Sequence, residues 1–549
     1  MESSLEDRYR EHREKVQADR LALEKELISC GGEDVLLTKQ RRDVLLLQPS
    51  DLLLQLRKGE LSAVTVLQSY QSKALDLARS FNCITEFIPD AKAWAEALDK
   101  LAQDERRALH GLPVSVKDCI MVKGLDCTLG LLKKVGQPAP VDADVVTVLK
   151  ELGAVPFVKT NASQLCISIG CSNPLWGAAR HPLNAARTPG GSSGGEGVLI
   201  SGGGSVLGIG TDLGGSIRLP ASWCGVVGIK PTAKRMSRRG LVGALRPIGI
   251  FGTWGLMGKD GAFVAEATKA IFSAADFHAC DPEVPPLSWN DSVYLSKMAL
   301  RVGWFDSISL FPSTPGVKRA VAQAVAAFEA LGHEVVAFPE QNWIEGLDIC
   351  VQLLFADQGK FVDLLLDGET VDEELLWYKS FAAVPPDQTE DRCPELQRQF
   401  GSVAVQHSFC TLSSCTDLWK KMIERSVFVN TFYQNWKSNG LDLLLCPVYP
   451  SPAPKTEQVG MINFSMMLTA IFNVMDYPAA AVPVTRQTQE EELNIANYSC
   501  TDKIHDLIKQ NGRDAVGLPL GVQLVALPYG EELLCRAIAE LSNSLKYKY

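Results

Sequence analysis

Apolar residues along the chain follow two different patterns, which alternate with one another. Short apolar runs, typical of buried strands, occupy residues 112–116, 154–158, 300–305, 333–338 and 441–446. Between several of them lie longer segments with apolar residues at helical spacing, at 142–152, 315–331 and 417–436. Repeated strand–helix–strand units of this kind predict an α/β fold with a largely parallel sheet flanked by helices.

Polar and glycine residues at the ends of these segments predict where the helices begin and end. The helix over residues 142–152 has Asp142 as its candidate N-cap and Gly153 as its candidate C-cap. The helix over residues 315–331 ends at Gly332, and the one over 417–436 is followed by Asn439 and Gly440.

The first residues differ from the rest because they are strongly charged. Residues 2–28 read as a helix with six Lys or Arg and eight Asp or Glu, and they contain no apolar run that would mark a signal peptide. We therefore expect a charged helical segment over residues 1–40, followed by one domain over residues 41–549. Two connectors, at residues 281–287 and 384–394, are too short to divide that domain.

Composition narrows the functional classes. The chain of 549 residues is 46% hydrophobic and has a net charge of −10, which argues against disorder and against nucleic-acid binding. No stretch of about 18 apolar residues occurs, so no membrane-spanning helix is expected. Fifteen scattered cysteines form no CxxC pair and no zinc-like spacing with the seven histidines. We expect an intracellular protein with reduced thiols and neither metal nor cofactor.

Glycine is concentrated in one part of the chain. Residues 187–225 hold thirteen of the 44 glycines, together with Ser192, Ser193 and Ser216. Glycine allows a backbone to approach a ligand closely and to adopt positive φ, and successive N–H groups in such turns bind anions. This window is therefore the candidate functional centre.

Three chemical interpretations of the window compete. A phosphate-binding loop is disfavoured because the window contains neither lysine nor the GxxxxGK[ST] pattern. A hydrolase nucleophile elbow fits GxSxG around Ser192 or Ser193, but the preceding residues are loop-like and no histidine has a suggestive context. The third interpretation uses Lys117, at the end of an apolar strand, where burial disfavours the charged form and lowers the pKa of a lysine. A neutral lysine can activate a serine, so Lys117, Ser192 and Ser216 could form a relay.

Three motifs in the same order resemble the amidase signature family. They are GLPVSVKD at residues 111–118, GGSSGG at 190–195, and GTDLGGSIRLPA at 210–221 followed by Cys224-Gly225. The similarity extends through CSNP at 171–174 to MDYPAAAVPVT at 475–485 and GLPLGVQLVALP at 517–528, and it is strongest to the fatty-acid amide hydrolase branch. The resemblance implies a large twisted mixed sheet, mostly parallel, surrounded by helices.

The resemblance also implies roles for individual residues. Ser216 would be the nucleophile, Ser192 the proton bridge and Lys117 the base that later acts as acid. The N–H groups of Leu213, Gly214, Gly215 and Ser216 would form an oxyanion hole. Ser193 would support the triad by hydrogen bonds, and Cys166 and Thr211 would border the substrate pocket. Asp212 and Arg218 would form a buried pair that holds the glycine turns.

The implied activity is hydrolysis of an acyl amide, with a fatty-acid primary amide or an N-acylethanolamine as substrate. Two alternatives remain open: a glutamine-type or other small-amide hydrolase, and a catalytically silent partner protein with this fold. The fatty-acid amide hydrolase branch has an apolar helix pair that contacts membranes. The corresponding region, residues 375–414, becomes polar and acidic, so we expect membrane contact to be at most peripheral. A homodimer is compatible with the sequence.

Overall fold

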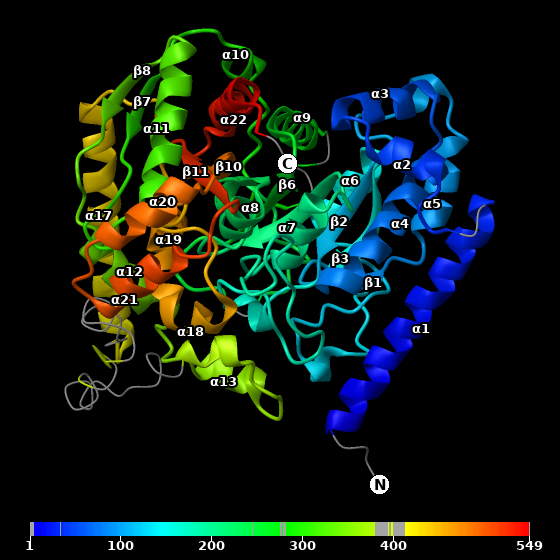
Figure 1. Cartoon of the computed structure of the whole chain (residues 1–549), viewed down its shortest axis with the longest axis horizontal. Helices are drawn as coiled ribbons and strands as arrows, with labels where there is room; N and C mark the ends of the chain where they lie inside the picture. Colours follow the sequence, from blue (N-terminus) through cyan, green and yellow to red (C-terminus); the bar gives the residue numbers. More distant parts are fainter. Residues whose placement is uncertain are drawn as a thin grey trace.

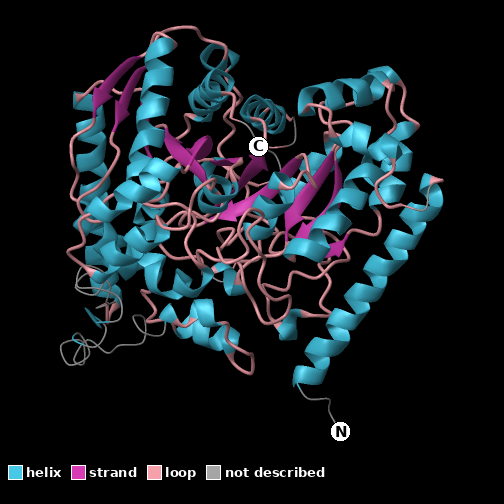
Figure 2. Ribbon diagram, in the orientation of Figure 1, coloured by secondary structure: helices cyan, strands magenta, loops and turns pink. Residues whose placement is uncertain are grey.

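A single mixed sheet crosses the interior of the molecule, between helices (Figures 1 and 2). The computed structural model describes residues 5–32, 35–243, 245–274, 277, 281–378, 394, 397–398 and 412–547. Its eleven strands lie in the order β1-β3-β2-β4-β6-β5-β10-β11-β9-β7-β8. They are β1 (Ile84–Phe87), β2 (Pro113–Lys117), β3 (Val155–Thr160), β4 (Leu207–Asp212), β5 (Val227–Lys230), β6 (Thr253–Gly258), β7 (Arg301–Trp304), β8 (Glu334–Ala337), β9 (Leu443–Pro447), β10 (Ala479–Arg486) and β11 (Pro519–Val525).

The α/β class and the mixed sheet are confirmed, but the expectation of mostly parallel strands is wrong. Parallel pairing is limited to β2 with β3 and β4, and to β7 with β8 and β9. The other six neighbouring pairs are antiparallel. The sequence pattern revealed those strands that are joined through apolar helices, and these strands are parallel to one another. Glycines interrupt β4, β5 and β6 and hide their apolar runs.

Helices cover both sides of the sheet. Those of the first half are α1 (Leu5–Gly31), α2 (Lys39–Leu45), α3 (Pro49–Lys58), α4 (Ala63–Phe81), α5 (Ala91–Asp99), α6 (Asp144–Glu151), α7 (Gly194–Ser201), α8 (Arg218–Cys224) and α9 (Gly261–Phe272). Those of the second half are α10 (Asp291–Tyr294), α11 (Pro315–Ala330), α12 (Trp343–Leu354), α13 (Lys360–Leu366), α17 (Cys415–Ser438), α18 (Val459–Ile462), α19 (Met467–Val474), α20 (Gln489–Asn494), α21 (Lys503–Asn511) and α22 (Glu531–Leu545).

The predicted helices are present, but one predicted cap is wrong. Helix α6 follows Ala143 and ends before Gly153, whose φ of +84° is the left-handed conformation expected after a helix. Asp142 does not cap this helix. Its carboxylate instead accepts hydrogen bonds from the Lys123 N–H and from Lys150 Nζ, so a competing local ion pair uses the side chain that the sequence pattern assigned to the cap.

The charged N-terminal segment forms α1, which lies along one edge of the molecule (Figure 1). Tyr9, Val16 and Leu27 are buried, and they fall on one stripe of the helix. Arg20 donates to the carbonyl of Ile84 at the edge strand β1. Within the described ranges, no helix is both long and apolar enough to span a bilayer. All of the predicted connector at residues 384–394 except residue 394, and most of the region 375–414, lie outside the described residues.

Helices α7 and α8 pack in the interior and position the candidate site. Every residue of α7 before Ser201, and every residue of α8, is buried. Because neither helix has an exposed face, both are stable only inside a core, where the charged side chains of Glu196 and Arg218 have polar partners. The glycine-serine window thus folds into two buried helices joined by β4, and its loops converge at one end of the strands.

Candidate active site

Lys117 lies at the end of β2, between the parallel neighbours β3 and β4. Its side chain is fully buried. Its Nζ donates hydrogen bonds to Ser192 Oγ at 2.6 Å and to Thr211 Oγ1 at 2.9 Å. Within the described ranges Lys117 forms no ion pair with a carboxylate. The structure therefore brings Lys117 and Ser192 together, as the sequence predicted.

The neighbouring Asp118 belongs to the opposite face of the strand. Its carboxylate lies 3.8 Å from Lys159 Nζ and accepts hydrogen bonds from the Thr128 hydroxyl at 3.0 Å and the Leu129 N–H at 2.8 Å. Adjacent side chains of a strand alternate between faces. Asp118 is consequently paired with Lys159 and leaves Lys117 to the serines.

Ser192 lies in a tight loop that requires small residues. A Cβ added to Gly191 would lie 1.6 Å from the carbonyl oxygen of Gly170, so only glycine fits beside that backbone. The Gly191–Ser192 peptide bond is cis. The next residue, Ser193, donates its N–H to the Ser216 carbonyl at 3.1 Å, and its hydroxyl contacts the backbone of Thr211 at 3.3 Å. Ser193 thus ties the loop to β4 and to Ser216.

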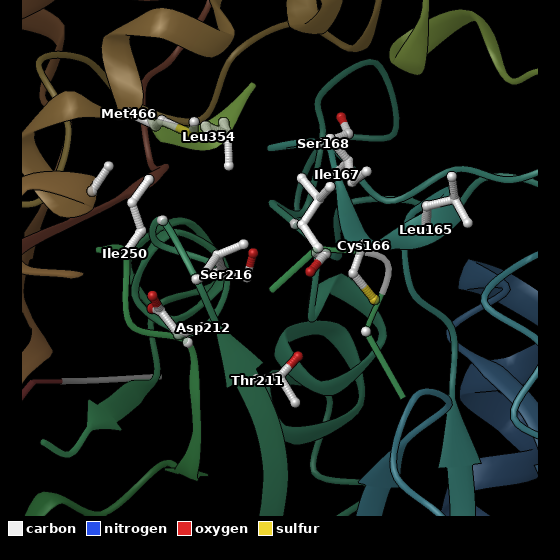
Figure 3. Close-up of a pocket in the computed structure, with 18 of the residues that line it drawn as sticks. Leu165, Cys166, Ile167, Ser168, Thr211, Asp212, Ser216, Ile250, Leu354 and Met466 are labelled. Carbon is white, nitrogen blue, oxygen red and sulfur yellow. The ribbon is translucent and has the colours of Figure 1, made fainter. Parts of the chain in front are cut away.

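Ser216 follows a glycine turn between β4 and α8. Gly215 has a φ of +133°, a conformation that residues with a side chain rarely adopt. The Thr469 hydroxyl donates to the carbonyl of Gly214 at 2.7 Å and fixes the turn from helix α19. The Ser216 side chain is half-buried, and its hydroxyl makes no hydrogen bond to another described residue. The hydroxyl is therefore available to a ligand in the adjoining cavity (Figure 3).

The backbone N–H groups of this turn are not equivalent. Gly215 donates its N–H to Asp212 Oδ1 at 2.8 Å. Of the four N–H groups predicted to form the oxyanion hole, this one is therefore already used. In the described part of the chain, no acceptor receives the N–H groups of Leu213, Gly214 or Ser216. Three donors at one turn are thus left for an oxygen of a ligand.

Asp212 and Arg218 form the buried pair predicted to hold the turn. The two side chains are fully buried and lie 2.8 Å apart, with Arg218 also bonded to Gln523 and Asn473. Burial alone raises the pKa of Asp212, but the Arg218 guanidinium and its hydrogen bonds more than offset this and hold that pKa well below its usual range. A charged pair therefore anchors both ends of the segment that carries Ser216.

A largely apolar cavity of about 1130 Å³, counting the space at its mouth, opens above the two serines. Of the residues predicted to bind substrate, Cys166, Thr211, Leu213 and Gly214 line it, whereas Ser193 and Gly215 lie behind its wall. Its polar lining includes Ser168, Asn463, Arg238 and Arg246. Its apolar lining includes Ile167, Leu241, Ile250, Leu354, Trp377 and Met466. Figure 3 shows Leu354, Met466 and Ile250 on the side opposite Cys166 and Leu165.

Glu196 is a residue of the site that the sequence analysis missed. It belongs to the first turn of α7 and is fully buried. Ser115 on β2 and Thr160 on β3 donate to its carboxyl oxygens at 2.5 and 2.8 Å. Burial raises the pKa of Glu196 to about 8. The glutamate joins the Ser192 loop to the strand of Lys117. The one signal for it in the sequence is its position in the segment GGSSGGEG, directly after the glycines that follow the two serines.

The competing interpretations of the glycine window do not match this geometry. A nucleophile elbow needs a strand immediately before its serine, but only an isolated bridge at Arg187 precedes Ser192. None of the described histidines lines the cavity. No group of His, Cys, Asp or Glu in the described ranges is arranged to hold a metal ion. The hydroxyls of Ser192, Thr211 and Ser216 line the cavity, and Lys117 contacts two of them from behind its wall.

Comparison with known proteins identifies the family of the chain. The family described as Amidase matches residues 65–535. The chain belongs to the amidase family. It is 38% identical over 517 residues to fatty-acid amide hydrolase 1 of Sus scrofa, covering 91% of this chain and 86% of that protein. It is 34% identical to fatty acid amide hydrolase 1 of Caenorhabditis elegans, covering 90% and 87%. This amidase is thus a hydrolase that acts on amide bonds.

A solved structure shares the fold of this amidase. The structure of a fatty acid amide hydrolase superposes with a TM-score of 0.83, covering 98% of this chain and 95% of the other at 22% identity. A 6-aminohexanoate cyclic dimer hydrolase superposes with a TM-score of 0.68. The amidase-signature resemblance and the fold it implied, apart from the balance of strand directions, are confirmed.

Proposed function

We propose that this amidase hydrolyses fatty-acyl amides, either primary amides or N-acylethanolamines, to the free acid and ammonia or ethanolamine. The observation that carries the proposal is the largely apolar cavity that Ser216 lines, with a hydroxyl that has no hydrogen-bond partner among the described residues. Burial of an acyl chain in such a cavity contributes about 0.8 kcal/mol per methylene. The names of the two relatives above support the same substrate class.

In the proposed reaction, Ser216 Oγ attacks the amide carbonyl and forms an acyl-enzyme. Its proton passes to Ser192 Oγ, and Ser192's own proton passes across the 2.6 Å contact to Lys117 Nζ, which in this step is the neutral amine and accepts the hydrogen bond from Ser192. The lysine returns the proton through Ser192 to the departing nitrogen, because an amine anion is a poor leaving group. Water then takes the place of the amine, and the same relay deprotonates it as it attacks the acyl-enzyme.

The negative charge on the carbonyl oxygen would be stabilised by the free N–H groups of Leu213, Gly214 and Ser216. Such donors act because they are already oriented before the reaction, and loss of one typically costs about 10²–10³ in rate. The contact from Thr469 to the Gly214 carbonyl and the contact from Gly215 to Asp212 fix these donors. We also propose an intracellular location, in which the fifteen cysteines stay reduced.

A series of primary amides of increasing acyl length tests the substrate class. We expect kcat/KM to rise from acetamide to long-chain amides, and Ser216→Ala to lower it by a factor of about 10³ or more. Ser222→Ala is the matched control, since this serine lies in buried helix α8 but not in the cavity wall. A preference for acetamide or glutamine would instead support the small-amide alternative, and no turnover of any amide would support the silent-partner alternative.

A further inference from the structure

Two cysteines line the cavity next to the serines and lysine. Cys119 lies two residues beyond Lys117, and Cys166 ends the short 3₁₀ helix Gln164–Cys166. Both contribute to the wall that also contains Ser192 and Ser216. Cys166 is partly exposed to this space, and Figure 3 shows it beside the pocket with Thr211 and Ser216.

The two thiols lie in the wall of the same cavity, and one of them is linked to the lysine. Cys119 Sγ lies 3.5 Å from Thr211 Oγ1, and the same hydroxyl receives a hydrogen bond from Lys117 Nζ at 2.9 Å. A hydrogen bond from the Cys166 thiol and the proximity of Lys117 lower the pKa of Cys119. Burial acts in the opposite direction but is outweighed. The same interaction raises the pKa of Cys166. Cys119 is therefore the more acidic of the two thiols, with Cys166 as its hydrogen-bond donor.

The backbone around Cys166 holds its thiol in this place. Leu165 and Cys166 both have positive φ, at +55° and +59°, which residues with a side chain rarely adopt. Hydrogen bonds from the Leu165 N–H to the Leu129 carbonyl and from the Cys166 N–H to the Ser163 carbonyl, both 2.9 Å, maintain the conformation. Conformations of this kind persist where surrounding contacts enforce them and are common at functional sites.

Other cysteines of the core have the opposite character. Burial raises the pKa of Cys127 to about 12, and the same is true of Cys171 and Cys83. Reactivity of a cysteine towards oxidants follows thiolate character and access. Among the buried cysteines, Cys119, with the Cys166 thiol and an open cavity beside it, is thus the one best placed to react.

We propose that Cys119 and Cys166 are a redox pair, which a hydroperoxide converts into a disulfide within the substrate cavity. The Cys119 thiolate attacks one oxygen of the hydroperoxide, the O–O bond breaks, and an alcohol or water leaves with the released proton. Cys166 then attacks the sulfenic sulfur, the S–S bond forms, the S–O bond breaks, and water leaves. In total, two thiols lose two electrons and two protons, and the hydroperoxide is reduced to an alcohol and water.

The disulfide would disturb the site at two points. Cys119 Sγ would be bonded to Cys166 and would lose its thiol contact with the Thr211 hydroxyl that orients Lys117. The loop of Cys166 would be fixed to the strand end across the wall of the cavity. The effect on turnover rests on the proposed function, whereas formation of the bond does not.

The test treats the reduced full-length protein with hydrogen peroxide, blocks remaining thiols with N-ethylmaleimide, and maps peptides by mass spectrometry. We expect a cross-linked pair of peptides containing Cys119 and Cys166, which forms before Cys127 is oxidised. Amide turnover should fall with the same time course and recover on addition of dithiothreitol. Cys119→Ser should form no cross-link and lose no dithiothreitol-recoverable activity relative to its own untreated rate, whereas the control Cys127→Ser should behave as wild type.

The peptide map and the activity give separate answers. A map without the Cys119–Cys166 cross-link, under conditions that oxidise other thiols, would overturn the proposal whatever the activity. If the cross-link forms and amide turnover is unchanged, the claim that the disulfide lowers activity would be overturned. Absence of turnover in the untreated protein would count against the proposed function and leave the cross-link result intact.

Discussion

Lys117 Nζ donates a hydrogen bond to Ser192 Oγ at 2.6 Å, although the two residues are 75 positions apart in the sequence. The lysine reaches this position because β2 ends at it between the parallel neighbours β3 and β4, and the serine because glycines fold its loop against the same strand end. In the proposed reaction this contact carries the proton between nucleophile and leaving group.

Replacement of Lys117 should slow both steps of the reaction. We expect Lys117→Ala to lower kcat for a long-chain primary amide by a factor of about 10²–10⁴, because the general base and acid are removed. Lys123→Ala, an exposed lysine close by in the sequence, should leave kcat unchanged. The measurement is steady-state ammonia release, and wild-type kcat in Lys117→Ala would exclude the lysine from the relay.

Thr211 should act as a positioning residue for the lysine. Thr211→Val keeps the shape of the side chain but removes the hydroxyl that accepts from Lys117 Nζ at 2.9 Å. Loss of one such bond is worth about 0.5–1.5 kcal/mol, so we expect kcat to fall by about twofold to tenfold with little change in KM. A change confined to KM would show that the hydroxyl contacts substrate instead.

The buried pair under Ser216 should matter for stability. Asp212→Asn leaves the Arg218 charge buried without its partner, and we expect the free energy of unfolding to fall by about 3–5 kcal/mol in urea denaturation. Lys92→Ala breaks an exposed ion pair with Glu26 and should cost less than about 1 kcal/mol. Equal costs for the two variants would contradict a structural role for Asp212 and Arg218.

Glu196 should make stability depend on pH. Because its pKa is raised from 4.5 to about 8, the folded protein holds this proton more tightly than the unfolded chain. The resulting stabilisation is complete below about pH 4.5 and is lost as the pH rises through about 8. Glu196→Gln stays neutral and should flatten the decline in Tm between pH 5 and 9, whereas the exposed Glu151→Gln should not. An unchanged slope in Glu196→Gln would contradict this assignment.

Leu354 offers a test of how the cavity selects acyl chains. It lines the main cavity and also a smaller neighbouring one, on the side opposite Cys166 (Figure 3). Leu354→Trp would fill space that a long chain needs, so we expect kcat/KM for long-chain amides to fall while that for short-chain amides is maintained. A uniform fall for all lengths would indicate damage to the reacting groups.

The sequence predicted those features that depend on local pattern. The strand before Lys117, the glycine turn before Ser216 and the helix α11 all follow from residues that are neighbours in the chain. Strand directions were predicted less well because glycine interrupts β4, β5 and β6. The contribution of Thr469 was not predictable, since its hydroxyl reaches Gly214 across 255 positions and has no local signature.

Within the site, too, the local motifs predicted some features, whereas contacts between distant residues determine others. The motifs placed Lys117 and Ser192 correctly side by side, but they could not show that Gly215 donates its N–H to Asp212. That detail depends on the position of the Asp212 carboxylate, which the buried Arg218 fixes and which a motif does not specify. The assignment of catalytic roles to Lys117, Ser192 and Ser216 remains a prediction for experiment.

Labelling with a fluorophosphonate probe tests the central claim most directly, because the probe phosphorylates a serine only when that serine is an activated nucleophile. We predict one adduct per chain, located on Ser216 by peptide mass spectrometry, absent in Ser216→Ala and strongly slowed in Lys117→Ala. An adduct on another residue, or undiminished labelling of Ser216→Ala, would contradict the account.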